Sequence, residues 1–497
     1  MYLLGYDIGS SSIKAALVEA ETGRTVGVAQ YPEMEMAIAS PQSDWAEQAP
    51  KAWWESVCYA TRLLLDKTGV APDSIRAIGI AYQMHGLVCV GKNQEVLRPS
   101  IIWCDSRAVA IGNQAFDALG PQRCLAHLLN SPGNFTASKL KWVQENEPDT
   151  YNKIDKIMLP GDYIAMKLTG EAVTTISGLS EGIFWDFKEN GVAAMVLEHY
   201  GIDPDFIPDI VPTFSVHGKL SKHAAAEVGL PEGIPVSYRA GDQPNNALAL
   251  NVLNPGEVAA TGGTSGVVYG VTDEVLYDPK SRVNGFAHVN YTQEAPRIGV
   301  LMCINGAGIQ YSWMKHQVAA DGLSYDEMEK QLSAVPVGAD GLSILPFGNG
   351  AERILENQNL GAHFLGVQLN RHKRPHLYRA ALEGIAFAFV YGIDILKEMG
   401  LNMDVMRVGN DNLFQSSVFS TTIATLVGSQ IEMVETTGAV GAAKGAGYGA
   451  GLYPSLQEAM KGLTIHGTYE PTGNKEAYQE AYTRWLDGLN RMMEERK

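Results

Sequence analysis

Two short turns rich in Gly, Ser and Thr have the residue types that bind phosphate. One spans residues 9–12 (Gly-Ser-Ser-Ser) and the other spans residues 263–265 (Gly-Thr-Ser). Successive backbone N–H groups in such a turn, with hydroxyl groups beside them, form a concave surface that binds anions. A single turn of this kind is more often only a tight turn, but two copies at corresponding places favour a nucleotide site. The predicted phosphate ligands are Gly9, Ser10, Ser11, Ser12, Gly263, Thr264 and Ser265.

Apolar segments on both sides of each turn predict strand-turn-strand hairpins. The strands are expected at residues 1–6 and 13–18 around the first turn, and at residues 256–261 and 267–271 around the second. A P-loop would need the pattern G-x-x-x-x-G-K-[ST] between a strand and a helix, and no window of the chain satisfies it. The nearest segment, residues 438–444, has Ala443 where the second Gly should stand.

Two carboxylates follow apolar segments. Asp7 ends the first predicted strand, and Asp242 follows a predicted buried strand at residues 234–239. A buried carboxylate is costly unless it is paired or binds a metal, and strand ends are where open α/β sheets bind ligands. The alternatives are that Asp7 only begins a turn and that Asp242 caps a helix starting near Pro244. Lys14, on the returning strand, either adds a positive charge to the first turn or is a solvated edge residue.

Length and composition indicate a globular protein of two to four domains. Hydrophobic residues make up 45% of the 497 residues, and charged residues make up 19%. The formal net charge of −17 disfavours binding to nucleic acids and anionic membranes, although a nucleotide can still bind through local backbone dipoles and Mg²⁺. The chain shows no signal peptide and no apolar run of about 18 residues, which predicts a cytoplasmic protein. The five cysteines lack C-x-x-C spacing, which predicts neither disulfides nor a zinc site.

The elements that must position these residues fall into two halves, with predicted domains at residues 1–245 and 246–497. The first half also has predicted strands at residues 25–30 and 75–81 and a helix at 50–67, and the second has helices at 378–399, 416–427 and 475–495. Small residues at 438–451 fall at helical spacing, which predicts close helix packing rather than a dinucleotide-binding loop. One face of the last helix is apolar, as is typical of core packing. Its residues are Tyr478, Ala481, Trp485, Leu489 and Met492.

Taken together, six segments resemble the FGGY family of carbohydrate kinases, and most closely its xylulokinase members. They are residues 7–14, 83–86 (Gln-Met-His-Gly), 101–107, 241–243 (Gly-Asp-Gln), 260–266 and 437–443. The matching blocks run in the family's order from about residue 3 to about residue 450 and so cover nearly the whole chain. The resemblance implies an α/β fold of the actin/hexokinase/Hsp70 type, in which two ribonuclease-H-like domains close over a cleft that holds sugar, Mg²⁺ and ATP.

The resemblance also implies catalytic roles for both carboxylates. Moving a γ-phosphoryl group to a sugar hydroxyl needs mainly positioning, charge stabilisation and one carboxylate that accepts the hydroxyl proton. In this family that base follows a Gly just before the second domain, where Gly241 and Asp242 stand. Asp7 would face Mg²⁺ and the phosphates, and both Asp7 and Asp242 would contact the metal through water.

The tract at residues 83–86 resembles the sugar contacts of xylulokinases. His85 would hydrogen-bond to the sugar hydroxyls and Met84 would pack against the carbon chain, although a lone His among apolar neighbours is ordinarily a core residue. Trp103 and Asp105 would line the same pocket, with a plain core position for Trp103 as an equal alternative.

Two segments depart from the family pattern. Gln243 stands where xylulokinases usually have Asn. Asp242 and Gln243 would both contact the sugar. The extra methylene of Gln leaves the depth of the sugar pocket open. The adenosine tract at residues 408–416 has a single Gly where the family commonly has a run of glycines, although Asn and Asp can still form a turn with left-handed residues. The predicted nucleotide ligands there are Gly409, Asn410 and Asn412, and Phe414 is a candidate for stacking on the base.

The predicted activity is therefore ATP-dependent phosphorylation of a ketopentose, most directly of D-xylulose to D-xylulose 5-phosphate, with ATP as co-substrate and Mg²⁺ as cofactor. Alternatives within the family are kinases for ribulose, glycerol or another polyol. An alternative from another class is a non-catalytic actin-like protein that binds sugar and nucleotide; the presence of both Asp7 and Asp242 argues against it. The predicted partners are a small-molecule sugar and a nucleotide, not nucleic acid or a membrane, and a homodimer stays open.

Overall fold

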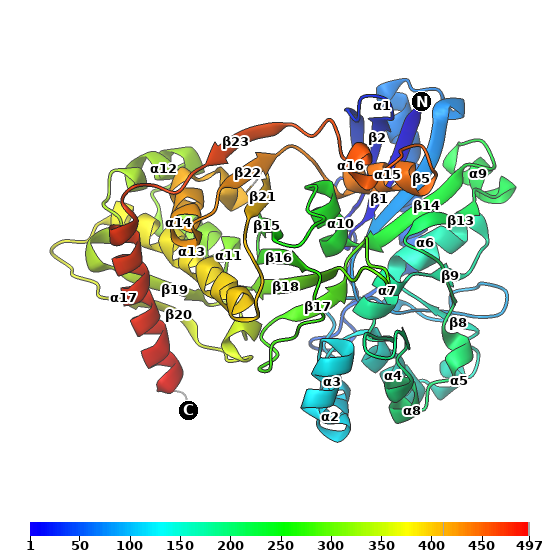
Figure 1. The fold of residues 1–497 in the computed structure, drawn as a ribbon, viewed down its shortest axis with the longest axis horizontal. Coiled ribbons are helices and arrows are strands. Elements are labelled where there is room, and N and C mark those ends of the chain that lie inside the picture. Colours follow the sequence, from blue (N-terminus) through cyan, green and yellow to red (C-terminus); the bar gives the residue numbers. More distant parts are fainter. Residues whose placement is uncertain (411, 496–497) are drawn as a thin grey trace.

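The computed structural model describes residues 1–410 and 412–495. The chain forms two lobes, each built around one mixed β-sheet (Figure 1). The first sheet has six strands in the order β13-β14-β5-β1-β2-β3, and the second has seven in the order β17-β18-β16-β15-β21-β22-β23. The strands of the first sheet are β1 (Tyr2–Ile8), β2 (Ile13–Glu19), β3 (Thr25–Tyr31), β5 (Ile75–Tyr82), β13 (Phe214–Lys219) and β14 (Pro235–Gly241). Those of the second are β15 (Glu257–Gly262), β16 (Gly266–Thr272), β17 (Asn284–Ala287), β18 (Ile298–Ile304), β21 (Val405–Gly409), β22 (Ile431–Val434) and β23 (Ile465–Tyr469).

Five strands in each sheet repeat one arrangement. The antiparallel strands β3-β2-β1 are followed by the parallel strands β5 and β14. In the same way, the antiparallel strands β18-β16-β15 are followed by the parallel strands β21 and β22. This is the ribonuclease-H-like strand order, so the predicted fold of two such domains is confirmed. The β1–β2 and β15–β16 pairs are the two predicted hairpins, and their turns occupy equivalent places in the two sheets.

Helices cover both sheets. α1 (Pro50–Thr68) precedes β5, and α13 (Arg374–Glu398) precedes β21. α1 begins with Pro50, whose fixed φ suits the first helical turn, and ends at Gly69, which adopts a φ of 65° that favours glycine. The other helices that bear on the site are α4 (Thr136–Asn146), α7 (Ile176–Glu181), α10 (Asp242–Ala249), α11 (Gly308–Trp313), α12 (Tyr325–Ser333), α14 (Ser417–Val427), α15 (Gly438–Gly449) and α17 (Lys475–Glu494).

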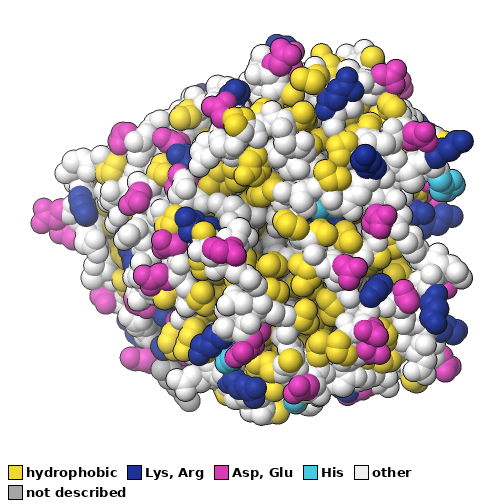
Figure 2. Space-filling model, turned by 45° about the vertical axis from the view of Figure 1, so that its right-hand side comes forward, with side chains coloured by type: hydrophobic (Ala, Val, Ile, Leu, Met, Phe, Trp, Pro, Cys, Tyr) yellow, Lys and Arg dark blue, Asp and Glu magenta, His cyan; other side chains and the backbone are white. Residues whose placement is uncertain are grey.

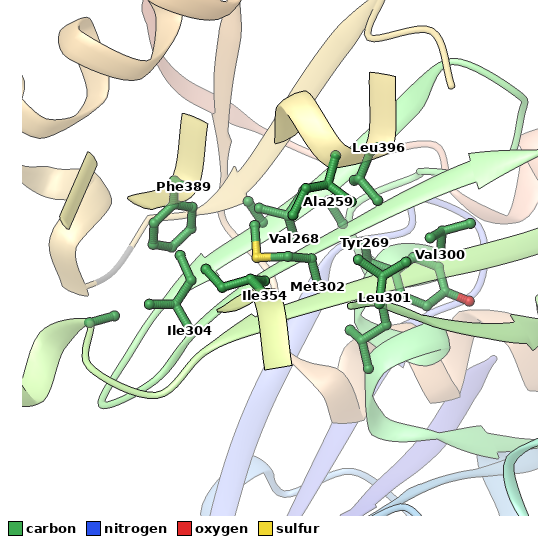
Figure 3. Close-up of a cluster of buried hydrophobic side chains, with 14 of the residues drawn as sticks. Ala259, Val268, Tyr269, Val300, Leu301, Met302, Ile304, Ile354, Phe389 and Leu396 are labelled. Atoms are coloured by element: carbon green, nitrogen blue, oxygen red, sulfur yellow. The ribbon is translucent and has the colours of Figure 1, made fainter. Parts of the chain in front are cut away.

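The core of the second lobe lies between its sheet and α13. Figure 3 shows Phe389 and Leu396 of α13 over Val268 and Met302 of the sheet. All four side chains are fully buried. Burial of each such side chain stabilises the fold by about 1.5–3 kcal/mol. Because Val268 belongs to β16, the same packing fixes the second hairpin relative to α13.

α15 follows β22 of the second sheet but packs on the first sheet, against β1, β5 and β14 (Figure 1). The approach is close because glycines face it: a Cβ atom at Gly5 would lie 1.9 Å from the carbonyl oxygen of Ala439, and one at Gly79 would lie 2.0 Å from that of Ala442. The predicted role of residues 438–451 in close helix packing is therefore confirmed. The domain boundary at residue 245 stays a prediction.

The elements expected from the sequence are present, with small shifts at their ends. The predicted helix at 378–399 is α13, which begins four residues earlier at Arg374, and the predicted helices at 416–427 and 475–495 are α14 and α17. The apolar face of α17 packs on the core as expected, with Tyr478, Ala481, Trp485 and Leu489 buried. All five cysteines are free, and no group of three or more metal-binding side chains occurs in residues 1–410 and 412–495.

The surface mixes charges of both signs. Figure 2 shows hydrophobic side chains gathered near the middle of one face, with Lys, Arg, Asp and Glu spread singly around them. On that face the acidic side chains are spread among basic ones rather than gathered in one block. Within the described part of the chain, no helix combines the length and the apolar character needed to cross a membrane.

Candidate active site

Asp7 and Asp242 lie at the same edge of the first sheet. β1, β5 and β14 are parallel; Asp7 is in register with Ala81 of β5, and Ala81 is in register with Ala240 of β14. Asp242 follows two residues later, as the first residue of α10. Parallel strands bring their carboxyl ends to one edge of a sheet, which is where ligands bind in open α/β sheets. The structure therefore brings the two predicted catalytic carboxylates together.

The simpler interpretations of these charged residues do not hold. Asp7 lies inside β1, not in the turn, and pairs across the hairpin with Lys14. Lys14 is half-buried rather than fully solvated. α10 begins at Asp242 itself with Gly241 as the N-cap residue, so Asp242 does not cap a helix that starts near Pro244. Both carboxylates consequently lie at this edge without the simpler turn or capping role.

Burial raises the pKa values of both carboxyl groups. The pKa of Asp242 rises from 3.8 to about 7, first because the group is desolvated and second because Asp7 is negatively charged. Burial also raises the pKa of Asp7, while the positive charge of Lys14 lowers it. A carboxylate that titrates near neutral pH is suited to general-base catalysis. The pKa of Asp242 is therefore suited to accepting a proton at neutral pH.

The N-terminus of α15 lies against Asp7. Thr437 is its N-cap residue and accepts a hydrogen bond from the Val440 N–H. A Cβ atom at Gly438 would lie 2.7 Å from Asp7 Oδ2 and 3.2 Å from Asn246 Oδ1, so only glycine leaves this space free. A helix N-terminus favours anions such as phosphate. The backbone of residues 437–440 is therefore a third candidate for anion binding, beside the two predicted turns.

The same space has the chemistry of a Mg²⁺ site. Two repelling carboxylates and the Asn246 amide oxygen are oxygen donors, which Mg²⁺ prefers, and a cation would relieve the repulsion that raises the pKa of Asp242. Mg²⁺ usually keeps several waters and takes only one or two carboxylates plus substrate phosphates. Asp7 and Asp242 fit that pattern, and which of them binds the ion stays a prediction.

The first turn is fixed by contacts from outside the hairpin. Gln48 Nε2 donates a hydrogen bond of 2.6 Å to the Ser10 carbonyl, and the Met36 N–H donates one of 2.7 Å to the Ser11 carbonyl. Trp103 Nε1 lies 3.4 Å from Ser10 Oγ, and the Trp103 side chain is 53% exposed. The alternative of Trp103 as plain core is therefore wrong: it lies over the first turn, and its predicted contact with sugar stays a prediction.

The second turn opens onto a cavity of about 490 Å³. The turn is held from behind by α11, since the N–H groups of Gly308 and Ile309 donate to the carbonyls of Gly263 and Thr264. Thr264 and Ser265 are exposed. The cavity is lined by residues 262–264 of the turn, by α11 and α12, and by residues 412–413 and 415–416. The predicted phosphate-binding turn and a pocket of nucleoside size therefore adjoin each other.

The predicted adenosine tract is only partly at this cavity. Asn412 lines it and adopts a left-handed φ of 53°, as expected for a turn, whereas Gly409 ends β21 and Asn410 Nδ2 contacts Glu435 Oε2. Asp411 lies outside the described residues. The proposed stacking of Phe414 on the base is wrong, because Phe414 is fully buried between Phe389 and Phe419.

Two tyrosines at the cavity were not predicted from the sequence. Tyr311 of α11 and Tyr325 of α12 stack with their ring centroids 5.4 Å apart, and both line the cavity. The hydroxyl group of Tyr311 is buried without a hydrogen-bond partner. Nearby, Glu329 accepts hydrogen bonds from the hydroxyls of Ser416 and Ser417. In the sequence, the Gly-Ala-Gly segment at residues 306–308, shortly after an apolar strand, could have indicated this part of the cavity.

On the sugar side, Met84 and His85 adjoin the base. Met84 is buried, and a Cβ atom at Gly241 would lie 2.6 Å from its Cγ. The His85 ring lies between Phe135, at 4.7 Å between ring centroids, and Phe286, at 5.6 Å. Burial first, and then the positive charges of Lys139 and Arg353, lower the pKa of His85 to about 3, so that the imidazole is neutral at physiological pH.

The other predicted sugar residues differ in their surroundings. Gln243 is half-buried directly beside Asp242, where it lowers the pKa of that carboxyl by hydrogen bonding. Asp105 is fully buried and bonded to the Arg107 guanidinium at 2.7 Å and to the Ala46 N–H at 2.6 Å. Asp105 is therefore a structural residue and not a sugar ligand, because its oxygens are already paired.

Comparison with protein families agrees with this geometry. The N-terminal domain of the FGGY family of carbohydrate kinases matches residues 2–249, and the C-terminal domain of the family matches residues 258–450. The chain belongs to the FGGY family. It is accordingly an ATP-dependent sugar kinase whose substrates are a small-molecule sugar and a nucleotide.

Individual members of the FGGY family match over nearly the whole chain. The xylulose kinase of Bacillus subtilis is 28% identical over 93% of this chain and 90% of its own, and the L-xylulose/3-keto-L-gulonate kinase of Escherichia coli is 28% identical over 97% and 95%. The crystal structure of the xylulose kinase from Rhodospirillum rubrum superposes with a TM-score of 0.89 at 27% identity, covering 99% of this chain and 100% of that one. A glycerol kinase from Plasmodium falciparum shares the fold, with a TM-score of 0.88 at 19% identity over 99% of this chain and 98% of that one.

Another cavity, larger than the one beside the second turn, lies away from these residues. It has a volume of about 920 Å³ and is lined by side chains of both halves, including Trp185, Phe214, Tyr291 and Tyr448. Tyr448 is near the C-terminal end of α15, whose N-terminal end lies at Asp7. The length of α15, at about 1.5 Å per residue, separates this cavity from the catalytic edge. Size alone therefore does not identify the active site of this FGGY member.

Proposed function

We propose that this chain transfers the γ-phosphoryl group of ATP to D-xylulose and releases D-xylulose 5-phosphate. The proposal rests on the close packing of Gly241 and Met84. This packing places the predicted sugar tract, residues 83–86, beside Asp242, a carboxyl group with a pKa of about 7. A base that titrates near neutral pH is suited to accept a hydroxyl proton. The xylulose kinases among the relatives support the same class of substrate.

In the proposed reaction, Met84 and His85 hold the sugar with one hydroxyl group at Asp242. The Asp242 carboxylate accepts the hydroxyl proton while the sugar oxygen bonds to the γ-phosphorus and the bond to the β-phosphate oxygen breaks. The turns at residues 9–12 and 263–265 hold the phosphate oxygens through N–H and hydroxyl groups. Mg²⁺, when bound near Asp7 and Asp242, neutralises part of the phosphate charge.

We propose that the nucleoside occupies the cavity of about 490 Å³ beside the second turn. Tyr311 and Tyr325 supply aromatic surface and Asn412 supplies an amide, while Thr264 and Ser265 face the phosphates. This arrangement directs the γ-phosphate from the second lobe toward Asp242 in the first. Protection of residues 308–313 from hydrogen exchange by an ATP analogue would support this location, and unchanged exchange there with the analogue bound would oppose it.

A coupled assay of ADP release with D-xylulose, L-xylulose, D-ribulose, glycerol and gluconate tests the substrate. We expect the highest kcat/KM for D-xylulose, by about tenfold or more, because a buried polar group left without its partner costs about 1–3 kcal/mol. A higher value for ribulose or glycerol would assign the enzyme to that substrate instead, with the longer Gln243 side chain as the first position to examine. Binding of sugar and nucleotide without phosphoryl transfer would favour the non-catalytic alternative.

We also propose a cytoplasmic location and a homodimer as the assembly to test first. Light scattering after size-exclusion chromatography distinguishes a monomer from a dimer. A dimer that dissociates below the concentrations used in the activity assay would show that the monomer is the active unit.

A further inference from the structure

His85 adopts a backbone conformation that needs support. Its φ is 62°, in the left-handed region that side chains other than glycine rarely adopt and that costs about 1–3 kcal/mol. β5 ends at Tyr82, and His85 lies in the segment that follows, beside the sheet edge that carries Asp7 and Asp242. Contacts around His85 must therefore hold it in place.

Two buried ionisable residues form hydrogen bonds with the backbone of His85, one with its N–H and one with its carbonyl. The His85 N–H donates to Glu181 Oε2 at 3.3 Å, and the His85 carbonyl accepts a hydrogen bond of 2.9 Å from Lys139 Nζ. Lys139 also donates to the Ile102 carbonyl at 3.0 Å. The exposed fraction is 1% for Glu181 and 0% for Lys139. The backbone at His85 is thus held by hydrogen bonds to side chains of α7 and α4.

Glu181 also determines which ring nitrogen of His85 carries the proton. His85 Nδ1 lies 2.9 Å from the Glu181 carbonyl oxygen, which can only accept a hydrogen bond, so Nδ1 must carry a hydrogen. The carbonyl is available because Glu181 is the last residue of α7, and the final carbonyls of a helix have no partner within it. The neutral ring then presents Nε2 as a lone pair, and no hydrogen bond to Nε2 is formed by the residues that the structure describes.

The Glu181 side chain also touches the residues beside the base. A Cβ atom at Gly241 would lie 3.1 Å from Glu181 Oε2, on the side where Met84 also packs. The Glu181 side chain also interacts with the Tyr82 side chain, and its Oε2 lies 3.7 Å from His85 Nδ1. The carboxyl group therefore holds the His85 N–H within a set of close neighbours, and Gly241 limits its position.

We propose that Glu181 is a positioning residue for sugar recognition, which holds His85 in the left-handed conformation with Nδ1 protonated so that Nε2 accepts a hydrogen bond from a sugar hydroxyl. The inference rests on the proposed function in taking His85 as a sugar contact. It adds that the sugar must offer a hydroxyl hydrogen at this position, because neutral Nε2 cannot donate. An analogue with hydrogen or fluorine in place of that hydroxyl would lose the contact.

The activity test compares Glu181→Ala with Glu181→Gln. The amide oxygen of Gln can still accept the His85 N–H, whereas Ala leaves it without a partner. We expect the sugar KM to rise about tenfold or more in Glu181→Ala, as for loss of a buried hydrogen bond, and to stay within about threefold in Glu181→Gln. The exposed Glu189→Ala variant of the same loop region is the matched control and should keep the wild-type KM. Equal loss in the Ala and Gln variants would overturn the proposal.

A double-mutant cycle then separates positioning from general structural damage. If Glu181 acts through His85, the Glu181→Ala substitution should raise the sugar KM in the wild type but have almost no further effect in a His85→Ala background. Additive effects would show that Glu181 acts independently of His85 and would overturn the proposal. If His85→Ala leaves KM unchanged for every sugar in the panel, the assignment of the sugar site is wrong, which is a failure of the proposed function.

A measurement without turnover completes the test. Nitrogen-15 NMR of labelled His85 should show the tautomer with hydrogen on Nδ1 in the wild type and in both Glu181 variants, because the acceptor is the backbone carbonyl of residue 181. A hydrogen on Nε2 in the wild type would refute the inference whichever sugar is phosphorylated. The expected tautomer together with no activity on ketopentoses would instead refute the substrate and leave the geometry of His85 intact.

Discussion

The turn between β1 and β2 and the turn between β15 and β16 occupy equivalent places in two equivalent sheets, yet they differ in charge. Two residues before the first turn, Asp7 pairs with Lys14 across the hairpin. At the corresponding place before the second turn, uncharged Thr261 pairs with Val267. Both turns have the residue types predicted to bind phosphate through their backbone, but the first follows a strand that carries Asp7, close to the proposed base Asp242. We therefore expect the two hairpins to share an anion-binding role, and the side chain before each turn to decide what chemistry it takes part in.

The two turns also differ in what holds them. Side chains from distant segments fix the first, with Gln48 and Trp103 both bonded to Ser10. The backbone of α11 fixes the second, through the N–H groups of Gly308 and Ile309. Substitutions should therefore affect the first turn through individual side chains and the second mainly through changes to the backbone.

The largest effect on kcat is expected for substitution of the proposed base, Asp242, beside the first turn. Asp242→Asn should lower kcat by about 10²–10⁴-fold, because an amide cannot accept the hydroxyl proton. The exposed Asp209→Asn variant is the control and should keep wild-type kcat. Steady-state kinetics with ATP and D-xylulose measure the change; a kcat within a few-fold of wild type would remove Asp242 from the catalytic role.

Substitution of Asp7, just before the first turn, should have the next largest effect on kcat. Asp7→Asn is expected to lower kcat by about 100-fold and to raise the Mg²⁺ concentration needed for half-maximal rate, because one anionic oxygen ligand is lost. Thr261→Val, at the equivalent place in the second hairpin, should change kcat by no more than about threefold. Similar losses at both positions would mean that the two turns do not differ in function.

The pH profile tests the coupling of the two carboxylates. Asp242 is active when deprotonated and its pKa is about 7, so kcat/KM should fall about tenfold per pH unit below that value. Asp7→Asn removes the negative charge that raises this pKa, and its acid limb should therefore move to lower pH. An acid limb that stays in place would show that Asp7 does not interact with the base.

A smaller effect is expected at the helix that faces Asp7. Gly438→Ala would place a Cβ atom 2.7 Å from Asp7 Oδ2, so the carboxylate must shift, and kcat should fall about tenfold. Gly473→Ala is the control, since no atom lies within 4 Å of a Cβ atom there. Thermal melting of both variants shows whether the change is local; wild-type kcat in Gly438→Ala would mean that Asp7 tolerates displacement.

The smallest effect is expected at the second turn. Thr264→Ala removes one exposed hydroxyl while the N–H groups of the turn remain, so KM for ATP should rise only about two- to fivefold. KM for the sugar should not change, because Thr264 lies at the nucleotide cavity. A large loss of kcat in this variant would show that the second turn contributes to catalysis as much as the first.

Local patterns in the sequence predicted the hairpins, most of the helices and the meeting of Asp7 with Asp242. Each of these depends on the order of residues within one element or on the rule that parallel strands end at one edge. The partner of His85 could not be found in this way, because Glu181 is 96 residues away and the contact depends on how α7 packs. Phe414 and Asp105 were assigned wrongly for the same reason: burial beside Phe389 and pairing with Arg107 are set by tertiary packing, which short motifs do not encode.

The packing of α15 on the first sheet has a consequence for how the protein is made. β1, β5 and β14 are synthesised by residue 241, but the helix that covers one face of them is not complete until residue 449. At about 5–20 residues per second, the nascent chain carries that apolar face uncovered for roughly 10–40 s. During this interval only the face packed by helices of the first lobe, such as α1, is buried. A ribosome that stalls between the two lobes would release a first sheet that lacks the helix covering its other face.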